Sequence, residues 1–294
     1  MSALFGPAGN ADSFAAQGYK TNAQAPEFVK KFGLDAYEYQ CGRGVRLNAQ
    51  TAKEFAQSAK ELGIRVSLHA PYYISLSSVE AEKREKSVEY ILQSAQAVQT
   101  LGGDRIVVHS GSCAKITRAH ALELALETIQ RARQTLDENG LQQVYICPET
   151  MGKINQLGTL QEVMELCAFD ERMIPCIDFG HLNARTLGGL RDYADFKAVL
   201  DTIENKLGNE RMRRFHAHFS KIEYTDSGEK RHLTFSDTVY GPDFEPLALL
   251  LAQRNCEPTI ICESSGTQAE DALTMKQLYQ QALSATQAKK GESR

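Results

Sequence analysis

The stretch Val144-Tyr-Ile-Cys-Pro-Glu149 is a short apolar run that ends in a carboxylate, and four other apolar runs end in a carboxylate or a histidine. Those four are Val66-Ser-Leu-His69, Ile106-Val-Val-His109, Ile174-Pro-Cys-Ile-Asp178 and Thr259-Ile-Ile-Cys-Glu263. Short runs rich in β-branched residues indicate buried strands. Because each run closes on an imidazole or a carboxylate, strands lying side by side would bring these groups to one point. The pattern therefore predicts a cluster of metal ligands where the strands end.

Longer stretches with helical periodicity separate these runs. We expect strands at Ala3–Phe5, Ala36–Tyr39, Arg65–His69, Arg105–His109, Val144–Glu149, Met173–Asp178, Arg214–His218 and Thr259–Glu263. We expect helices at Ala49–Leu62, Val79–Leu101, Arg118–Asn139, Leu157–Ala168, Tyr193–Leu207, Phe244–Arg254 and Ala269–Leu283. This alternation predicts an α/β fold, a single (β/α)8 TIM-barrel domain over residues 1–294 with a frayed tail at 286–294. A doubly wound open sheet is the alternative, because periodicity does not show closure.

The composition is ordinary for a soluble globular protein. Hydrophobic residues make up 42% and charged residues 24%, and the formal net charge of −4 counts against a strongly basic, non-specific DNA binder. The seven cysteines form no C-x-x-C pair, which predicts reduced and mostly buried thiols. The sequence shows no signal peptide and no apolar run of about 18 residues, the length that spans a bilayer. We expect a cytoplasmic protein that contacts no membrane, and the sequence predicts no protein partner.

Two long connections accompany the strand ends. One opens with Phe5-Gly-Pro-Ala-Gly-Asn10, and the other is the charged segment Ser220–Asp243, which contains a histidine. Long connections in compact domains are often functional. We expect both to cover the site.

The carboxyl ends of barrel strands face one rim, where the active sites of this architecture lie. One metal ion takes about four to six donors, and the chain offers more than that number. A set of imidazoles and carboxylates suits zinc, manganese or iron. His216 and His218 share one strand face, so we expect one to bind metal and the other to support it or to contact substrate. His120, in a helical stretch, is expected in solvent. The candidate donors are His69, His109, Glu149, Asp178, His181, His216, His218, His232 and Glu263.

Several segments resemble endonuclease IV, the family of metal-dependent apurinic/apyrimidinic endonucleases built on a TIM barrel. They follow that family's order, and the Glu-Thr-x-Gly and Asp-x-x-His elements together are fairly specific. The matching segments are His69-Ala-Pro-Tyr-Tyr-Ile-Ser-Leu76, Val108-His-Ser-Gly-Ser112, Pro148-Glu-Thr-Met-Gly-Lys153, Leu157-Gly-Thr159, Ile177-Asp-Phe-Gly-His181, His216-Ala-His-Phe-Ser-Lys221, Arg231-His232 and Cys262-Glu-Ser264.

The resemblance implies a centre of two or three zinc ions, with manganese or iron as other options. The first ion would take His69, His109 and Glu149; the second Glu149, Asp178, His216 and Glu263; the third His181 and His232. Glu149 would also orient or deprotonate the attacking water. The implied activity is cleavage of DNA at abasic sites.

The chain departs from that family at three places. An aspartate two residues before the last histidine is replaced by Lys230, which cannot ligate a cation, so the third ion is missing, weakly held, or completed by Glu229 or Asp237. Lys230 is then a candidate for contacting substrate, as is His218, or it is a solvated lysine of a long polar loop. The first strand lacks the family's histidine-containing loop. The loop after the second strand keeps only Arg43 and Arg46 as phosphate contacts.

Tyr72 matches a position at which the family inserts a side chain into DNA. A sugar isomerase or epimerase on the same barrel remains the alternative function, favoured by the acidic charge, the reduced DNA loop and Lys230. The substrate is accordingly either abasic DNA or a small sugar. A third option is a metal-binding barrel that has lost catalysis.

Overall fold

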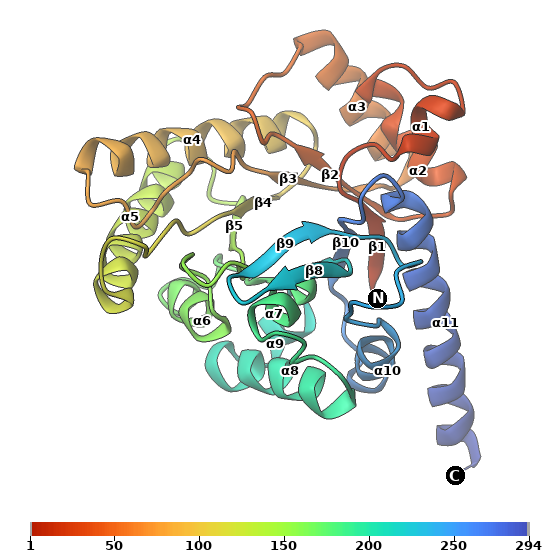
Figure 1. The fold of residues 1–294 in the computed structure, drawn as a ribbon. Coiled ribbons are helices and arrows are strands. Elements are labelled where there is room, and N and C mark those ends of the chain that lie inside the picture. Colours follow the sequence, from red (N-terminus) through yellow and green to blue (C-terminus); the bar gives the residue numbers. More distant parts are fainter. Residues whose placement is uncertain (1, 293–294) are drawn as a thin grey trace.

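Eight parallel strands form a closed barrel in the computed structural model, which describes residues 2–292 (Figure 1). The strands are β1 (Leu4–Pro7), β2 (Ala36–Gln40), β3 (Arg65–His69), β4 (Arg105–Val108), β5 (Tyr145–Pro148), β6 (Cys176–Asp178), β7 (His216–Phe219) and β10 (Thr259–Cys262). Hydrogen bonds join the strands into two four-stranded segments, β2-β3-β4-β5 and β6-β7-β10-β1. Isolated parallel bridges join them, Ala8 to Glu38 on one side and Ile146 to Met173 on the other.

Helices cover the outside of the barrel, as the α/β alternation predicts. They are α1 (Asp12–Ala16), α2 (Ala25–Lys31), α3 (Ala49–Leu62), α4 (Ala81–Thr100), α5 (Arg118–Glu138), α6 (Leu160–Ala168), α7 (Phe179–Arg185), α8 (Tyr193–Leu207), α9 (Asn209–Arg213), α10 (Glu245–Arg254) and α11 (Gln268–Glu292), with a 3-10 turn at Asn22–Gln24. The large apolar core lies between these helices and the strands, because alternate strand residues such as Ile106, Val108 and Ala217 point outward. A small separate cluster of Val107, Cys147, Ile174 and Cys176 lies inside the barrel.

The expected TIM barrel is confirmed, and α3 and α8 have the expected bounds. Sequence analysis did not predict α1 and α2, which lie in the long N-terminal connection, α7, which begins at the end of β6, or the short α9. The Ser220–Asp243 connection contains a hairpin, β8 (Ile222–Thr225) and β9 (Gly228–His232). Helix α11 continues to Glu292, so most of the expected frayed tail is helical, and residues 293–294 lie outside the described residues. Within residues 2–292, no helix is long and apolar enough to cross a membrane.

Candidate metal centre

Six of the nine candidate donors meet at the carboxyl ends of the strands, around a cavity of about 370 Å³. Strand alternation explains the meeting: the inward-facing positions of each strand are two residues apart, and the last one on several strands is an imidazole or a carboxylate. The cavity is lined by Gln40, His69, Tyr72, His109, Glu149, Met151, Lys153, Gln156, His181, Glu229, His232 and Glu263.

One group of donors consists of His69, His109 and Glu149, whose ligand atoms lie within 4.8 Å of one another. The Nε2 atoms of the two histidines are 3.4 and 3.1 Å from Oε2 of Glu149. Nδ1 of His69 lies 2.8 Å from the carbonyl oxygen of Ala70, to which it donates. This hydrogen bond leaves the lone pair on Nε2, so the imidazole presents an acceptor to the group.

A second group consists of Glu149, Asp178, His218 and Glu263. Nδ1 of His218 is 3.0 Å from Oε1 of Glu149 and 3.4 Å from Oε1 of Glu263. The two oxygens of Glu149 therefore face different groups, Oε2 the first and Oε1 the second.

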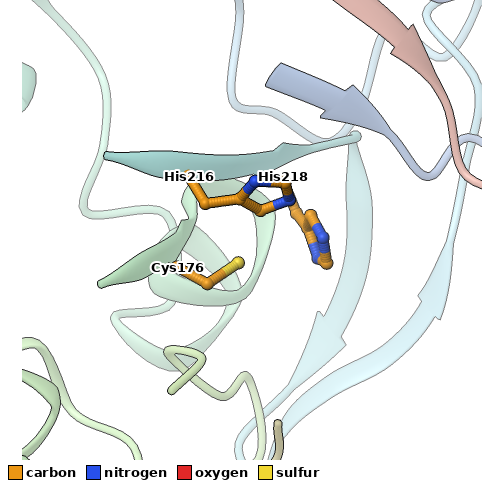
Figure 2. A group of neighbouring side chains, drawn as sticks. All are labelled: Cys176, His216 and His218. Carbon is orange, nitrogen blue, oxygen red and sulfur yellow. The ribbon is translucent and has the colours of Figure 1, made fainter. Parts of the chain in front are cut away.

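The histidine in this second group differs from the expected one. Sequence analysis assigned His216 to the ion and His218 to substrate; the structure places His218 with the carboxylates and His216 one step deeper in the barrel, beside Cys176 (Figure 2). The physical reason is the strand repeat: both side chains face inward, but only the later one reaches the rim.

Glu38 is a buried carboxylate beneath the centre that sequence analysis missed. Its Oε2 lies 2.9 Å from Nε2 of His216 and accepts a 2.9 Å hydrogen bond from Ser67, and its Oε1 lies 3.0 Å from Nε2 of His218. A carboxylate on the far side of a histidine fixes the ring and leaves the other nitrogen for a metal. The available signal was a glutamate inside the strand Ala36-Tyr-Glu-Tyr-Gln40, where an unpaired charge would be costly.

The third group consists of His181, Glu229 and His232. Nε2 of His181 lies 3.3 Å from Oε2 of Glu229, while Nδ1 of His181 lies 3.0 Å from the Thr150 carbonyl, to which it donates. Nδ1 of His232 pairs with the hydroxyl of Ser220 at 2.8 Å. Of the two completions considered from sequence, the structure has Glu229 in place and not Asp237.

A bulge in the β8–β9 hairpin explains why Glu229 takes this position. Tyr224 pairs with Glu229 and Glu223 pairs with Arg231, so Lys230 is an extra residue. Lys230 and Arg231 both reach Glu223, at 2.5 and 2.6 Å, and Lys230 is 54% exposed. Lys230 thus points away from the cavity, which agrees with the solvated alternative and not with a substrate contact.

The loop that carries Lys153 and Gln156 into the cavity is held by two arginines. Arg185 on α7 donates to the carbonyls of Met151 and Lys153, at 2.7 and 2.8 Å. It also donates to the carbonyls of Ile154 and Gln156, which Arg118 contacts as well. Because these bonds fix the backbone, the loop forms a rigid wall of the cavity. Lys153 and Gln156 were not among the predicted site residues, since nothing in their spacing marks them.

Tyr72 lies at the mouth of the cavity, with its ring centroid 6.2 Å from that of His69 and 6.3 Å from that of His109. It packs against Gly42 in the loop after β2, where a Cβ atom would lie 1.9 Å from the tyrosine oxygen. Arg43 and Arg46 are exposed in the same loop. The structure therefore places Tyr72 at the cavity and the two arginines outside its lining. His120 is exposed on α5, as expected, and pairs with Glu123.

The electrostatics of the centre fit a bound cation. Burial alone would raise the pKa of Glu149, but the imidazoles of His218, His109 and His181 hold it well below its usual range. Burial lowers the pKa of His69, yet the contact with Glu149 raises it to about 9. Burial raises the pKa of Asp178 to about 6. Protons on His69, His181 and His218, whose pKa values are raised, compensate the carboxylates, and a metal ion that displaced these protons would supply the same positive charge.

Two buried carboxylate oxygens are a further feature that suits a bound cation. Oε2 of Glu149 and Oδ2 of Asp178 are buried and accept no well-directed hydrogen bond from the described residues, although imidazole nitrogens of His109 and His181 lie 3.1 and 3.2 Å away, respectively. Such oxygens are costly to bury unless a positive group completes them. Mixed imidazole and carboxylate donors suit zinc, manganese or iron. The residues present therefore fit metal ions at this rim.

Comparison with known proteins agrees with this geometry. A sequence model of the xylose isomerase-like TIM barrel family matches residues 26–288. An uncharacterized protein of Methanocaldococcus jannaschii is 34% identical over 255 residues, 86% of this chain and 90% of that protein. The probable endonuclease 4 of Mycoplasma pneumoniae is 27% identical over 191 residues, 63% of each chain.

Solved structures extend the likeness to two kinds of enzyme. A D-tagatose 3-epimerase-like protein superposes with a TM-score of 0.69 at 19% identity, covering 90% of this chain and 93% of that one. Endonuclease IV of Thermus thermophilus superposes with a TM-score of 0.64 at 20% identity, covering 90% of this chain and 94% of that one. At these identities the likeness shows the fold. Together with the match over residues 26–288, it shows that the chain belongs to the xylose isomerase-like TIM barrel family, as a divergent relative of the endonuclease IV proteins.

Proposed function

We propose that this protein is a metal-dependent phosphodiesterase that cleaves DNA at apurinic/apyrimidinic sites. The observation that supports it best is the arrangement of three donor groups around one cavity, two of which share Glu149. Hydrolysis of a phosphodiester develops charge on the attacking and leaving oxygens at once, and several cations side by side suit that demand.

The three donor groups indicate which residues would hold the ions. His69, His109 and Glu149 form the first site; Glu149, Asp178, His218 and Glu263 the second; His181, Glu229 and His232 the third. Bound ions, most simply zinc, would act as Lewis acids on the phosphate and would lower the pKa of the attacking water.

The chain's own side chains supply the remaining steps. Glu149 is buried at the centre and ionised, so it can orient the attacking water and accept its proton. Lys153 lines the cavity and offers a fixed cation to a substrate phosphate. Tyr72 is exposed at the mouth, where an aromatic ring can fill the space of a missing base. Arg43 and Arg46, in the adjacent loop, would contact phosphates on either side.

A sugar isomerase or epimerase is the second candidate, and one observation favours it. The cavity has a volume of about 370 Å³, which suits a small molecule. It lies beside both the β8–β9 hairpin and the loop around Lys153 that Arg118 and Arg185 hold. Carboxylates and imidazoles beside a metal ion also suit proton transfer on a ketose.

The two candidates separate in one experiment. Metal-replete protein is incubated with a duplex that contains one abasic site, with the same duplex undamaged, and with a panel of ketoses. We expect cleavage of the abasic strand only, and loss of cleavage in Glu149→Gln. Conversion of a ketose without any DNA cleavage would reject the phosphodiesterase and favour the second candidate.

A further inference from the structure

A second cavity, of about 420 Å³, lies at the opposite end of the barrel, where the strands begin. We call it the basal cavity. Its lining includes Arg105 at the start of β4, Tyr145 at the start of β5 and Arg214 just before β7. Arg172, Arg211 and Ile174 complete its principal walls. Four arginines line the cavity against two glutamates, Glu171 and Glu210.

Arg105 is the buried member of this group, with only 4% of its surface exposed. Its Nε and Nη1 atoms are buried and donate no hydrogen bond to any residue in the described range 2–292. The nearest carboxylate oxygen is Oδ1 of Asp104, 3.5 Å from Nε. The other oxygen of Asp104 accepts a 2.5 Å bond from Arg65, so one carboxylate serves two guanidinium groups.

The other arginines of the basal cavity differ in the hydrogen bonds and ion pairs that they form. Arg172 is paired with both Asp137 and Asp170, and Arg211 donates to the carbonyls of Cys167 and Asp170. Arg214 meets Glu210 only at 3.3 Å and is 53% exposed. Burial and repulsion from Arg105 and Arg214 lower the pKa of Arg65, which places these three guanidinium groups within electrostatic reach of one another.

We propose that the basal cavity binds a small phosphate-bearing anion, with Arg105 as its buried anchor and Arg214 as a second contact at the opening. A buried guanidinium whose Nε and Nη1 donate no hydrogen bond to the described residues is costly, and an anion in the cavity would complete it. The guanidinium fork binds phosphate through two parallel hydrogen bonds. Tyr145, Ile174 and Leu207 give an apolar wall for the carbon part of a phosphate monoester.

This site is separate from the metal centre. Residues that start a barrel strand line the basal cavity, whereas residues that end a strand line the rim cavity, and none lines both. An anion bound at the base would not touch Glu149, so its effect would be on stability or regulation and not on the reacting bond. The proposal therefore stands or falls independently of the phosphodiesterase activity.

The test uses isothermal titration of the full protein with inorganic phosphate and with glucose 6-phosphate, and with glucose as the uncharged control. Because phosphate can also bind a metal centre, each titration is repeated after removal of metal with EDTA. We expect saturable binding of a phosphate compound that survives metal removal, and none of glucose. Tighter binding of glucose 6-phosphate than of phosphate would identify the monoester as the better ligand.

Three single substitutions locate the binding. Arg105→Gln should weaken it by about tenfold or more, since hydrogen bonds to a charged group contribute more than those between neutral groups. Arg214→Gln, at a half-exposed position, should weaken phosphate binding severalfold. If Arg105→Gln does not fold, the Arg214 variant tests the proposal in its place. Arg191→Gln removes a charge from a side chain that is 79% exposed and should have no effect. Binding that disappears with the metal, or equal affinity in all three variants, would overturn the proposal.

Discussion

The same strands carry arginines at one end of the barrel and histidines at the other. Arg65 and His69 lie four residues apart on β3, and Arg105 and His109 lie four residues apart along β4 and the turn after it. Arg214 and His218 repeat this spacing on β7 and the residues before it. Because inward positions recur every two residues, each of these three strands directs an arginine to the base and a histidine to the rim.

The difference between the ends lies in how their charges are compensated. At the rim, imidazoles and carboxylates pair with one another, and Oε2 of Glu149 and Oδ2 of Asp178 have ion-pair contacts with imidazoles but accept no well-directed hydrogen bond from the described residues. At the base, Nε and Nη1 of Arg105 donate no hydrogen bond to the described residues, and the contact of Nε with Asp104 is 3.5 Å long. Unpaired acceptors favour cations and unpaired donors favour anions. The comparison teaches that the ligand class at each end follows from the sign of the unmatched groups.

The largest expected effect is at the centre of the rim. Glu149→Gln keeps the shape of the side chain but removes its charge and its ability to accept a proton, so cleavage should fall by at least about 100-fold. Glu165→Gln, on the exposed side of α6, is the matched control and should retain activity. Near-native turnover of the Glu149 variant would remove that residue from its central role.

A second test compares the two histidines of β7. His218→Asn should cost the second ion, because Nδ1 of His218 is the only imidazole donor in that group. His216→Asn should leave the number of ions unchanged, since His216 lies deeper and contacts Glu38. Elemental analysis of both variants, after circular dichroism has shown that they fold, measures the difference. Loss of an ion in the His216 variant alone would restore the assignment expected from sequence.

The hairpin offers a matched pair for the third ion. Glu229→Gln should lower the metal content by up to one ion per chain, whereas Glu223→Gln, which removes the partner of Lys230 and Arg231, should not. Lys230→Asp should add no ion, because the bulge directs that side chain to solvent. An increase in bound metal in Lys230→Asp would show that position 230 reaches the cavity.

The smallest expected effect concerns DNA. The few basic residues near the rim predict weak binding with a shallow dependence on salt, below the about six to ten phosphate contacts of a strongly basic binder. Arg43→Gln and Arg46→Gln should each reduce the slope of log affinity against log salt by about 1, the change expected for one phosphate contact. A steep slope in the wild type, unchanged in both variants, would place the DNA on another surface.

The sequence predicted the barrel and most of the rim because both depend on the two-residue repeat of short apolar strands. It could not predict which of His216 and His218 reaches the rim, since both share one face and only the depth differs. The place of Glu229 depends on the bulge at Lys230, which the sequence does not reveal. Glu38 was missed because it lies inside a strand and not at its end. The basal arginines stand at the starts of the same strands, a position to which sequence analysis gave no weight.

The most direct test of the metal centre is the metal content of the purified protein. After expression with zinc, manganese and iron supplied, elemental analysis should find at least two tightly bound ions per chain, and three if the group of His181, Glu229 and His232 is filled. The same measurement on Glu149→Gln should give fewer ions, because that residue joins two groups. Fewer than one ion per chain in the wild-type protein would contradict the account.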